Sequence, residues 1–366
     1  MPSQLSLPIK DNILVHRPKE LSTTWAQRIV SHHANEAKVS ALNIESVSIG
    51  TSTRYRISVE HDAVEHLPTR WFVKTPSLRV KSRLITTLPR LLPKEVHFYR
   101  SLSQHTPLKL PPILAAQTRW GRGTTLVMAD LGELGFIPGQ ALDALSAPQA
   151  TQVIEQLARF HGHYWQNSQL LSKHRWLGGF GQAAEHYMGD VMALPLMKRG
   201  LKLAAEWIPG SLKQHALHYA ANRRQMMQVL ARGPQTLVHH DCHPGNLFWH
   251  GTQPGFLDWQ LVRIGEGIGD VAYFLATGLQ SDCRRQHEQA LLSHYLTVLS
   301  RHAIHGLDEK GLYHRYRAHL AYAFEAMVIT LAVGGMMEPE SNLELIRRTA
   351  DAVKDHDSFA ALKSKR

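Results

Sequence analysis

The sequence is poor in cysteine and contains no long apolar run. Two cysteines, Cys242 and Cys283, among 366 residues cannot form a disulfide framework, and free thiols are typical of a reducing compartment. The most apolar stretch, 326–337, is much shorter than the ~20 residues that a membrane-spanning helix needs. Residues 1–20 also lack the apolar core of a signal peptide. We therefore expect a cytoplasmic protein that does not enter a membrane.

Acidic side chains are outnumbered by basic ones. The chain has 30 Asp and Glu residues against 41 Lys and Arg, which gives a formal net charge of +11. Such a balance suggests nucleic-acid binding as one interpretation. The basic residues are spread along the chain, however, and this favours an ordinary solvated surface. We expect no nucleic-acid partner, and the oligomeric state stays open.

The first third of the sequence has the periodicity of strands. Residues 53–60 alternate the apolar Tyr55, Ile57 and Val59 with polar residues, as in a half-buried strand. Residues 70–75 and 124–128 read as two further strands, and Pro93 is expected to open a helix.

Helical periodicity dominates the rest of the chain. It covers residues 146–164, 214–231, 284–302, 311–333 and 343–353, with short strand-like pieces at 236–238, 247–249 and 255–257. A strand-rich part followed by a helix-rich part predicts an α+β protein. We divide the chain into an N-terminal lobe at 1–128, a hinge at 129–133 and a C-terminal lobe at 134–366.

Three oxygen-bearing side chains follow the strand that ends at Val238. A loop first presents Asp241 and Asn246, and a short hairpin over 247–257 then delivers Asp258. Carboxylate and amide oxygens can hold magnesium when phosphate oxygens complete the coordination shell. Phosphoryl transfer uses such a set, with an aspartate that accepts the hydroxyl proton. The pattern therefore indicates phosphoryl transfer to a hydroxyl group.

The loop sequence His239-His240-Asp241-Cys242-His243-Pro244-Gly245-Asn246 resembles the catalytic loop of the aminoglycoside phosphotransferase and choline kinase superfamily. The Asp258-Trp259-Gln260 motif and the segment 269–275 are most similar to the ecdysteroid-kinase-like branch. The resemblance implies a two-lobed protein-kinase-like fold, with a β-rich N-terminal lobe that binds nucleotide and a mostly helical C-terminal lobe. The acceptor pocket is then expected in the C-terminal lobe.

The resemblance also assigns roles to individual residues of the loop. It implies that Asp241 is the catalytic base, that Asn246 and Asp258 hold Mg²⁺, and that His239 stabilises the loop. Two positions depart from the family pattern, because His240 replaces a usual glycine and Cys242 replaces a usual aliphatic residue.

The nucleotide is expected to be ATP, bound by the first lobe. A kinase needs a strand lysine for the phosphates and a helical glutamate that holds this lysine, and Lys74 and Glu95 match these roles. The turn Gly50-Thr51-Ser52 could cover phosphates with amides and hydroxyls. The backbone from Met128 to Asp130 is expected to contact adenine.

Other interpretations of the same residues stay open. The histidines at 239, 240 and 243, with Cys242 and Asp241, could be zinc ligands, although no second Cys/His pair appears at a zinc-finger spacing. Asp258 could only cap a turn, Lys74 could be a strand-end lysine in solvent, and Glu95 could be a glutamate that favours a helix N-terminus. We interpret Asp270 as the N-cap of a helix that starts at Val271.

The sequence as a whole predicts an ATP- and Mg²⁺-dependent small-molecule kinase with a hydroxyl acceptor. The acceptor is expected to be neutral or apolar, because a basic chain repels a polycation. Apolar candidates for its pocket are Trp259, Tyr273, Phe274, Tyr322, Phe324, Met327, Met336 and Met337. The alternative is a catalytically silent kinase-fold protein that only binds nucleotide or regulates. A protein kinase is disfavoured, because no Ala-Pro-Glu signature follows Asp258.

Overall fold

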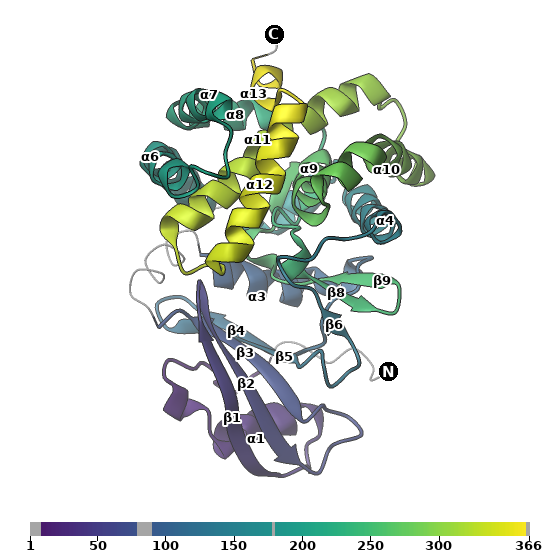
Figure 1. The fold of residues 1–366 in the computed structure, drawn as a ribbon. Helices are drawn as coiled ribbons and strands as arrows, with labels where there is room; N and C mark the ends of the chain where they lie inside the picture. Colours follow the sequence, from purple (N-terminus) through teal and green to yellow (C-terminus); the bar gives the residue numbers. More distant parts are fainter. Residues whose placement is uncertain (1–8, 79–89, 178–179, 364–366) are drawn as a thin grey trace. The chain divides into compact units, whose positions relative to one another are not determined.

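A computed structural model describes residues 9–78, 90–177 and 180–363 (Figure 1). The chain forms two compact units. Unit 1 comprises Met1–Pro138 and Leu257–Gln260, and unit 2 comprises Gly139–Phe256 and Leu261–Arg366. Within the described ranges, no helix combines the length and the apolar character needed to cross a membrane. The predicted lobe boundaries around residues 129–133 stay a prediction.

Unit 1 is built on a five-stranded antiparallel sheet in the order β1-β2-β3-β5-β4 (Figure 1). Its elements are α1 (Thr23–His33), β1 (Val39–Ile49), β2 (Ser52–His61), β3 (Arg70–Pro76), α3 (Leu91–Ser101), β4 (Ile113–Arg119), β5 (Gly123–Ala129) and β6 (Ile137–Pro138), with 3-10 turns at Pro18–Glu20 and Ser103–His105. The predicted strands at 53–60, 70–75 and 124–128 are confirmed. The predicted helix at Pro93 begins two residues earlier, at Leu91.

The two faces of this sheet carry different residues because side chains alternate along a strand. Tyr55 and Ile57 of β2 and Val73 of β3 are fully buried in one hydrophobic cluster with α1. In this cluster the rings of Trp25 and Trp71 meet edge to face, with centroids 6.2 Å apart. Helix α3 covers the other face, and the alternation places Lys74 on the α3 side (Figure 1).

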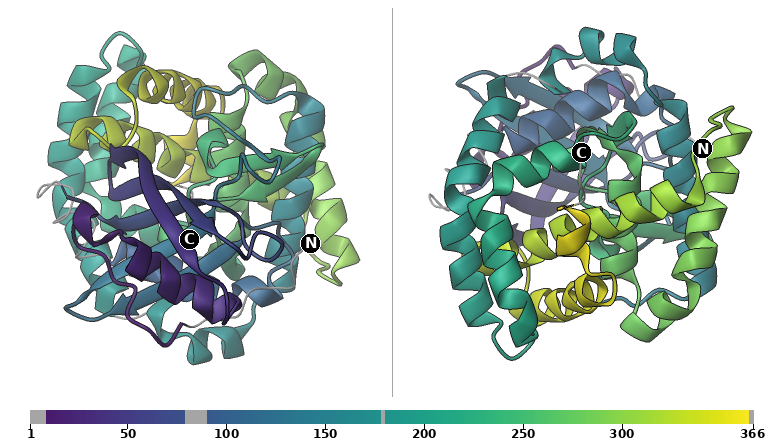
Figure 2. Two further views of the ribbon diagram at one scale, coloured as in Figure 1. Left: turned by 90° about the horizontal axis from the view of Figure 1, so that it is seen from below. Right: turned by 90° about the horizontal axis from the view of Figure 1, so that it is seen from above.

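Unit 2 is mainly helical (Figure 2, teal to yellow). Its elements are α4 (Ala147–His163), α5 (Ser168–Lys173), α6 (Phe180–Leu203), α7 (Gly210–Ala221), α8 (Arg223–Leu230), β7 (Gln235–Val238), β8 (Leu247–His250), β9 (Gln253–Phe256), β10 (Arg263–Glu266), α9 (Gly267–Gly278), α10 (Ser281–Arg301), α11 (Glu309–Val333), α12 (Pro339–Asp355) and α13 (Ser358–Ala361), with 3-10 turns at Arg175–Leu177 and Pro244–Asn246. A further 3-10 turn, Trp259–Leu261, begins in unit 1. The apolar helix α9 is buried along almost its whole length and packs against α11 and α4. Strand β7 pairs with β10, and β8 and β9 form a hairpin.

Two helix predictions need correction. The helix predicted over 214–231 is two helices, because Asn222 leaves the helical conformation at φ −112° and ψ 24°. The helix predicted to start at Val271 begins at Gly267, so Asp270 lies inside its first turn and is not its N-cap. The helix predicted from Ser146 is confirmed, since Ser146 and Gln149 form a capping box at the start of α4.

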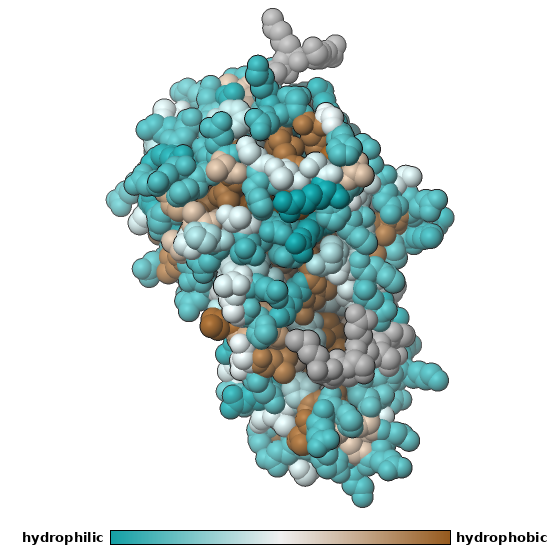
Figure 3. All heavy atoms as spheres, turned by 90° about the vertical axis from the view of Figure 1, so that its right-hand side faces the viewer, coloured by the Kyte–Doolittle hydropathy of each residue, from teal (hydrophilic) through white to brown (hydrophobic). Residues whose placement is uncertain are grey.

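The surface drawn in Figure 3 is mainly hydrophilic, and its hydrophobic side chains occur in small, separate groups. Large exposed hydrophobic residues include Val64, Trp120 and Tyr187. Scattered apolar residues of this kind are normal on a globular protein.

Candidate functional site

A buried ion pair joins β3 to α3 in unit 1. Lys74 Nζ donates to Glu95 Oε1 at 2.8 Å and to Glu95 Oε2 at 3.2 Å. Both residues are buried, with 4% and 0% of their surfaces exposed. Burial raises the pKa of Glu95, and the charge of Lys74 opposes this rise. The two residues predicted to act together are therefore in direct contact.

Asp258 lies beside this pair in unit 1. Its Oδ1 is 3.4 Å from Lys74 Nζ, and its Oδ2 is 3.7 Å from Arg54 Nη2. The backbone of Asp258 is left-handed, with φ 59°, which is uncommon for a residue other than glycine. The next residue anchors the segment, because Trp259 stacks on Phe98 of α3 with ring centroids 3.9 Å apart.

The Gly50-Thr51-Ser52 segment forms the turn between β1 and β2. The Gly50 amide donates to the Ser52 carbonyl at 3.0 Å, and the Gly50 carbonyl accepts from Ser77 Oγ at 2.8 Å. Ser52 is 1% exposed, and its Oγ has no hydrogen-bond partner among the residues that the structure describes. A buried hydroxyl without a partner is costly, and a ligand oxygen would satisfy it.

The predicted adenine-binding segment lies at the end of β5. Its amides are already engaged, since Ala129 N donates to the Pro112 carbonyl and Asp130 N to the Arg70 carbonyl, both at 2.9 Å. Met128 pairs with Phe72 in the sheet. The contact of Met128 to Asp130 with adenine stays a prediction, with carbonyl oxygens as the groups that could make it.

In unit 2, the carboxylate of Asp241 is held by two side chains. Asn246 Nδ2 donates to Asp241 Oδ2 at 3.0 Å and to the Asp241 carbonyl at 2.9 Å. Tyr273 of α9 donates its hydroxyl to Asp241 Oδ1 at 2.7 Å. Burial, with a further contribution from Asp241, raises the pKa of Tyr273 well above its ordinary value, so the phenol stays protonated and donates. The sequence offered Tyr273 only as a candidate for lining a pocket.

Asp270 anchors the loop that contains Asp241. Its two carboxylate oxygens accept the backbone amides of His239 and His240, each at 2.7 Å. His161 of α4 donates Nε2 to the same carboxylate at 3.2 Å. Asp270 is 1% exposed and lies one turn into α9. Its carboxylate therefore binds the 239–246 loop, a role that the sequence interpretation missed for both Asp270 and His161.

The backbone at His240 explains why glycine is usual at this position. His240 has φ 71°, a left-handed conformation that glycine adopts without strain. Its ring compensates in part, because it stacks on Tyr322 of α11 with centroids 4.3 Å apart and an interplanar angle of 25°. The histidine at this position therefore lacks the conformational freedom of the usual glycine, but it gains the contact of its ring with Tyr322.

The remaining residues of the loop hold its shape. Nδ1 of His239 accepts the Asp241 amide at 3.3 Å, and Nδ1 of His243 accepts the Gly245 amide at 3.1 Å. Cys242 is buried, which raises the pKa of its thiol well above the ordinary value. The described residues contain no group of three or more His, Cys, Asp or Glu side chains arranged to hold a metal ion.

Several residues suggested for an acceptor pocket instead form packed interior. Trp259, Phe274 and Phe324 are fully buried, and Met327 is 2% exposed. Tyr273 and Tyr322 differ from them, since they touch Asp241 and His240 of the loop. Met336 is exposed after the end of α11.

A sequence model of the phosphotransferase enzyme family, APH, matches residues 46–305. The chain belongs to this family. The assignment confirms the superfamily resemblance, the kinase-like fold with its β-rich and helical parts, and the enzyme class. The residues that the model matches are those of a phosphotransferase domain.

Individual relatives are distant. An uncharacterized kinase-like protein of Caenorhabditis elegans, D1044.1, is 23% identical over 223 residues, which cover 58% of this chain and 56% of that protein. The chain thus aligns with little more than half the length of this relative.

Among solved structures, an ethanolamine kinase of Plasmodium vivax has a TM-score of 0.49 at 11% identity, covering 93% of this chain and 89% of that one. The amicoumacin kinase hAmiN, solved with AMP-PNP, Ca²⁺ and its ligand, has a TM-score of 0.49 at 14% identity, covering 86% of this chain and 88% of that one.

The left-handed backbone at His240 allows a direct test of the conformational argument. The variants H240G and H240A both lose the ring that stacks on Tyr322, but only alanine keeps a Cβ in the strained conformation. H240G should be more stable than H240A by about 1 kcal/mol. Urea denaturation of the two variants measures the difference. Equal stability, or a more stable H240A, would contradict a left-handed His240.

Proposed function

We propose that this family member transfers the γ-phosphoryl group of ATP to a hydroxyl group of a small, neutral or apolar metabolite, with Mg²⁺ as the metal ion. The observation that carries the proposal is the Asp241 carboxylate, which is oriented by Asn246 and Tyr273 on a loop anchored by Asp270. Oriented carboxylates next to a substrate are what proton removal in a transition state requires. A cytoplasmic location and the absence of a nucleic-acid partner remain parts of this proposal.

Asp241 is the proposed base. Its side chain is 25% exposed, so a substrate can reach it. Tyr273 and Asn246 each occupy one carboxylate oxygen, and each oxygen keeps a second lone pair for an incoming hydroxyl. As the acceptor oxygen bonds to the γ-phosphorus, its proton passes to Asp241 and the bond to the β–γ bridging oxygen breaks. These two donors orient the carboxylate before the substrate binds.

Unit 1 is proposed to bind the nucleotide. Lys74 is held by Glu95 with its ammonium group fixed, which suits contact with phosphate oxygens. The buried hydroxyl of Ser52 supports a ligand over the turn that begins at Gly50 and Thr51. The proposed adenine contacts are those of the backbone from Met128 to Asp130.

The residues proposed for the metal fit magnesium in their chemistry. Asn246 turns its NH₂ group toward Asp241, which leaves its side-chain oxygen as the possible ligand atom. Asp258 supplies a carboxylate of which 18% of the side chain is exposed. Magnesium prefers such oxygen ligands and takes the rest of its shell from phosphates and water. When bound, the ion would neutralise phosphate charge.

The pairing of carboxylates in unit 2 supports a neutral acceptor. Glu325 of α11, in the turn after Tyr322, binds Arg223 Nε at 2.5 Å and Tyr219 at 2.8 Å. Asp190 also binds Arg223, at 3.2 Å. A polycationic acceptor needs carboxylates that are free to offset its desolvation. Because Arg223 already binds both carboxylates, they are less available to a cationic acceptor, and a neutral hydroxyl compound suits this unit better.

If the chain were a catalytically silent kinase-fold protein, we would expect it to lack at least one of the residues that phosphoryl transfer needs. Lys74, Glu95, Asp241, Asn246 and Asp258 are all present, and the first two are paired as transfer requires. We therefore favour an active enzyme.

Substitution of the base should separate binding from chemistry. In D241N the side chain keeps its shape but loses its charge and its ability to take a proton. Turnover should fall at least ~100-fold, while nucleotide affinity changes little. Single-turnover ATP consumption and nucleotide titration measure the two quantities. Near-normal turnover with a true acceptor would move the base elsewhere, with His243 as the next candidate.

Substitution of Asp258 should make the binding of ATP independent of Mg²⁺. D258A should lose the extra thermal stabilisation that Mg²⁺ adds to ATP, because a carboxylate ligand has been removed. E65A serves as a control, because Glu65 is an exposed acidic residue. If the Mg²⁺-dependent shift in melting temperature survives in D258A, the metal assignment fails.

A panel of acceptors tests the substrate class. Sterol-like alcohols, neutral sugars, choline and aminoglycosides are each incubated with the enzyme and Mg-ATP. Mass spectrometry then detects the added phosphoryl group. We expect product from a neutral alcohol. Efficient phosphorylation of an aminoglycoside or choline, with none of the neutral alcohols, would contradict the acceptor class and leave the phosphotransferase assignment intact.

A further inference from the structure

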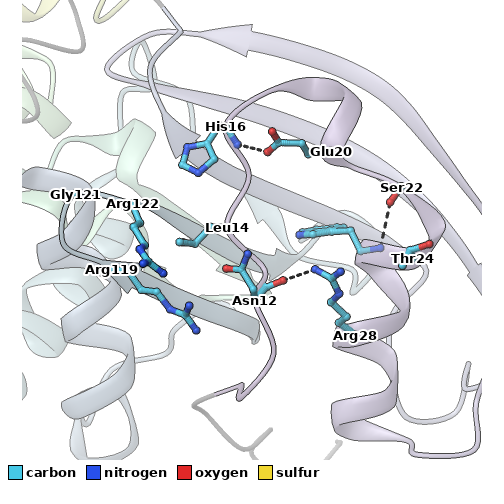
Figure 4. A pocket seen from close by; sticks show the side chains of 11 residues that line it. Asn12, Leu14, His16, Glu20, Ser22, Thr24, Arg28, Arg119, Gly121 and Arg122 are labelled. Atoms are coloured by element: carbon cyan, nitrogen blue, oxygen red, sulfur yellow. Dashed lines mark hydrogen bonds between the residues drawn. The ribbon is translucent and has the colours of Figure 1, made fainter.

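A concave site lies in unit 1, on residues other than those proposed for phosphoryl transfer. It has a volume of about 580 Å³ (Figure 4). Three segments line it: an extended N-terminal segment, the beginning of α1, and the turn between β4 and β5. The lining residues are Asn12, Leu14, His16, Glu20, Ser22, Thr24, Trp25, Arg28, Arg119, Gly121 and Arg122.

The extended segment that forms the base of this site is fixed by hydrogen bonds. Ile13 N donates to Gln117 Oε1 at 3.1 Å, and Val15 N donates to Thr125 Oγ1 at 2.9 Å. The indole of Trp25 donates to the Ile13 carbonyl at 2.9 Å. Ile13 and Val15 are buried in the hydrophobic cluster, so the alternation turns Asn12, Leu14 and His16 toward the cavity. The base is therefore preformed.

The turn between β4 and β5 approaches this segment closely. A Cβ atom at Gly123 would lie 2.8 Å from His16 Cε1, and Gly123 has φ 116°, so only glycine fits there. The Arg122 amide donates to the Arg119 carbonyl at 3.0 Å, which closes the turn. Arg119 and Arg122 thereby occupy the two ends of one tight turn. Figure 4 shows both side chains on the same side of the cavity.

The lining carries an excess of positive charge. Arg28 faces Arg119 and Arg122 from α1, and its Nη1 donates to the Asn12 carbonyl at 2.7 Å. The single carboxylate of the lining, Glu20, accepts the His16 amide at 2.7 Å. The first turn of α1 adds the partial positive charge of a helix N-terminus. Guanidinium groups that converge on one cavity bind phosphate or carboxylate oxygens in pairs.

We propose that this arginine-lined cavity binds a small polyanion that carries at least two phosphate or carboxylate groups. Three guanidinium groups from two separate walls suit two anionic groups on one molecule. The apolar residues of the lining, Leu14 and Trp25, are only 9% and 3% exposed, so the polar groups dominate the site. The volume is that of an ordinary small-molecule site. None of the residues proposed for ATP, metal or acceptor lines this cavity.

Pyrophosphate in magnesium-free buffer is the probe, titrated at constant ionic strength by calorimetry. Four proteins are compared: the unmodified chain, R119S/R122S, the matched control R224S/R232S and K74M. Arg224 and Arg232 are exposed arginines of unit 2, so the two double variants lose the same charge. K74M removes the lysine proposed for the ATP phosphates. Hydrogen exchange with and without pyrophosphate locates the bound ion.

We expect R119S/R122S to bind pyrophosphate at least ~10-fold more weakly, since charged hydrogen bonds are lost. R224S/R232S and K74M should keep this affinity and the protection of residues 12–16 and 119–123. Equal weakening in both double variants would reduce the effect to general surface charge and overturn the proposal. So would undetectable binding to the unmodified chain, or protection of residues 12–16 that survives in R119S/R122S.

Discussion

The buried carboxylate of Asp270 is the constraint on which the chemistry of unit 2 depends. It accepts the backbone amides of His239 and His240 and the imidazole of His161. A carboxylate that is 1% exposed would be very costly without such donors, and two charged-group hydrogen bonds to consecutive amides define a backbone direction. This anchor fixes where the loop begins, and Asn246 and Tyr273 then orient the Asp241 carboxylate.

The conformation of the loop also shows what this anchoring costs. Holding both amides toward one carboxylate places His240 in the left-handed region. Strained residues of this kind persist only where the surroundings hold them in place. Here Asp270 holds the amide and Tyr322 holds the ring. Unit 1 shows the same principle at Lys74 and Glu95, where a buried ion pair contributes position more than stability.

The sequence predicted those helices and strands in which apolar residues recur at the period of the element and are buried in the structure. The strand β2 was predictable because its buried residues alternate regularly. The edge strand β1 is exposed or half-buried along its whole length and so carries no such pattern. The long helix α6 was not predicted either, because its apolar residues occur on all sides and do not form one apolar face. The break at Asn222 was not predicted because no Gly or Pro marks it in the sequence.

The residues of the candidate site also divide into those that the sequence predicted and those that only the structure revealed. The loop motif, Lys74, Glu95 and Asp258 could be proposed from residue type and order. The contacts of Tyr273 and His161 could not, because they link positions 32 and 109 residues apart through the packing of α9 and α4. The arginine-lined cavity likewise depends on contacts across the sheet, such as Ile13 with Gln117, 104 residues away.

The most direct test of this account is the variant D270N, with D282N as a control, because the Asp282 side chain is 96% exposed. An amide at position 270 presents an NH₂ group to one of the two backbone amides and cannot hold both. The account predicts faster hydrogen exchange at His239 and His240 and a turnover at least ~10-fold lower, which corresponds to about 1.4 kcal/mol. Nucleotide binding should persist. Wild-type turnover together with unchanged exchange in D270N would contradict the account.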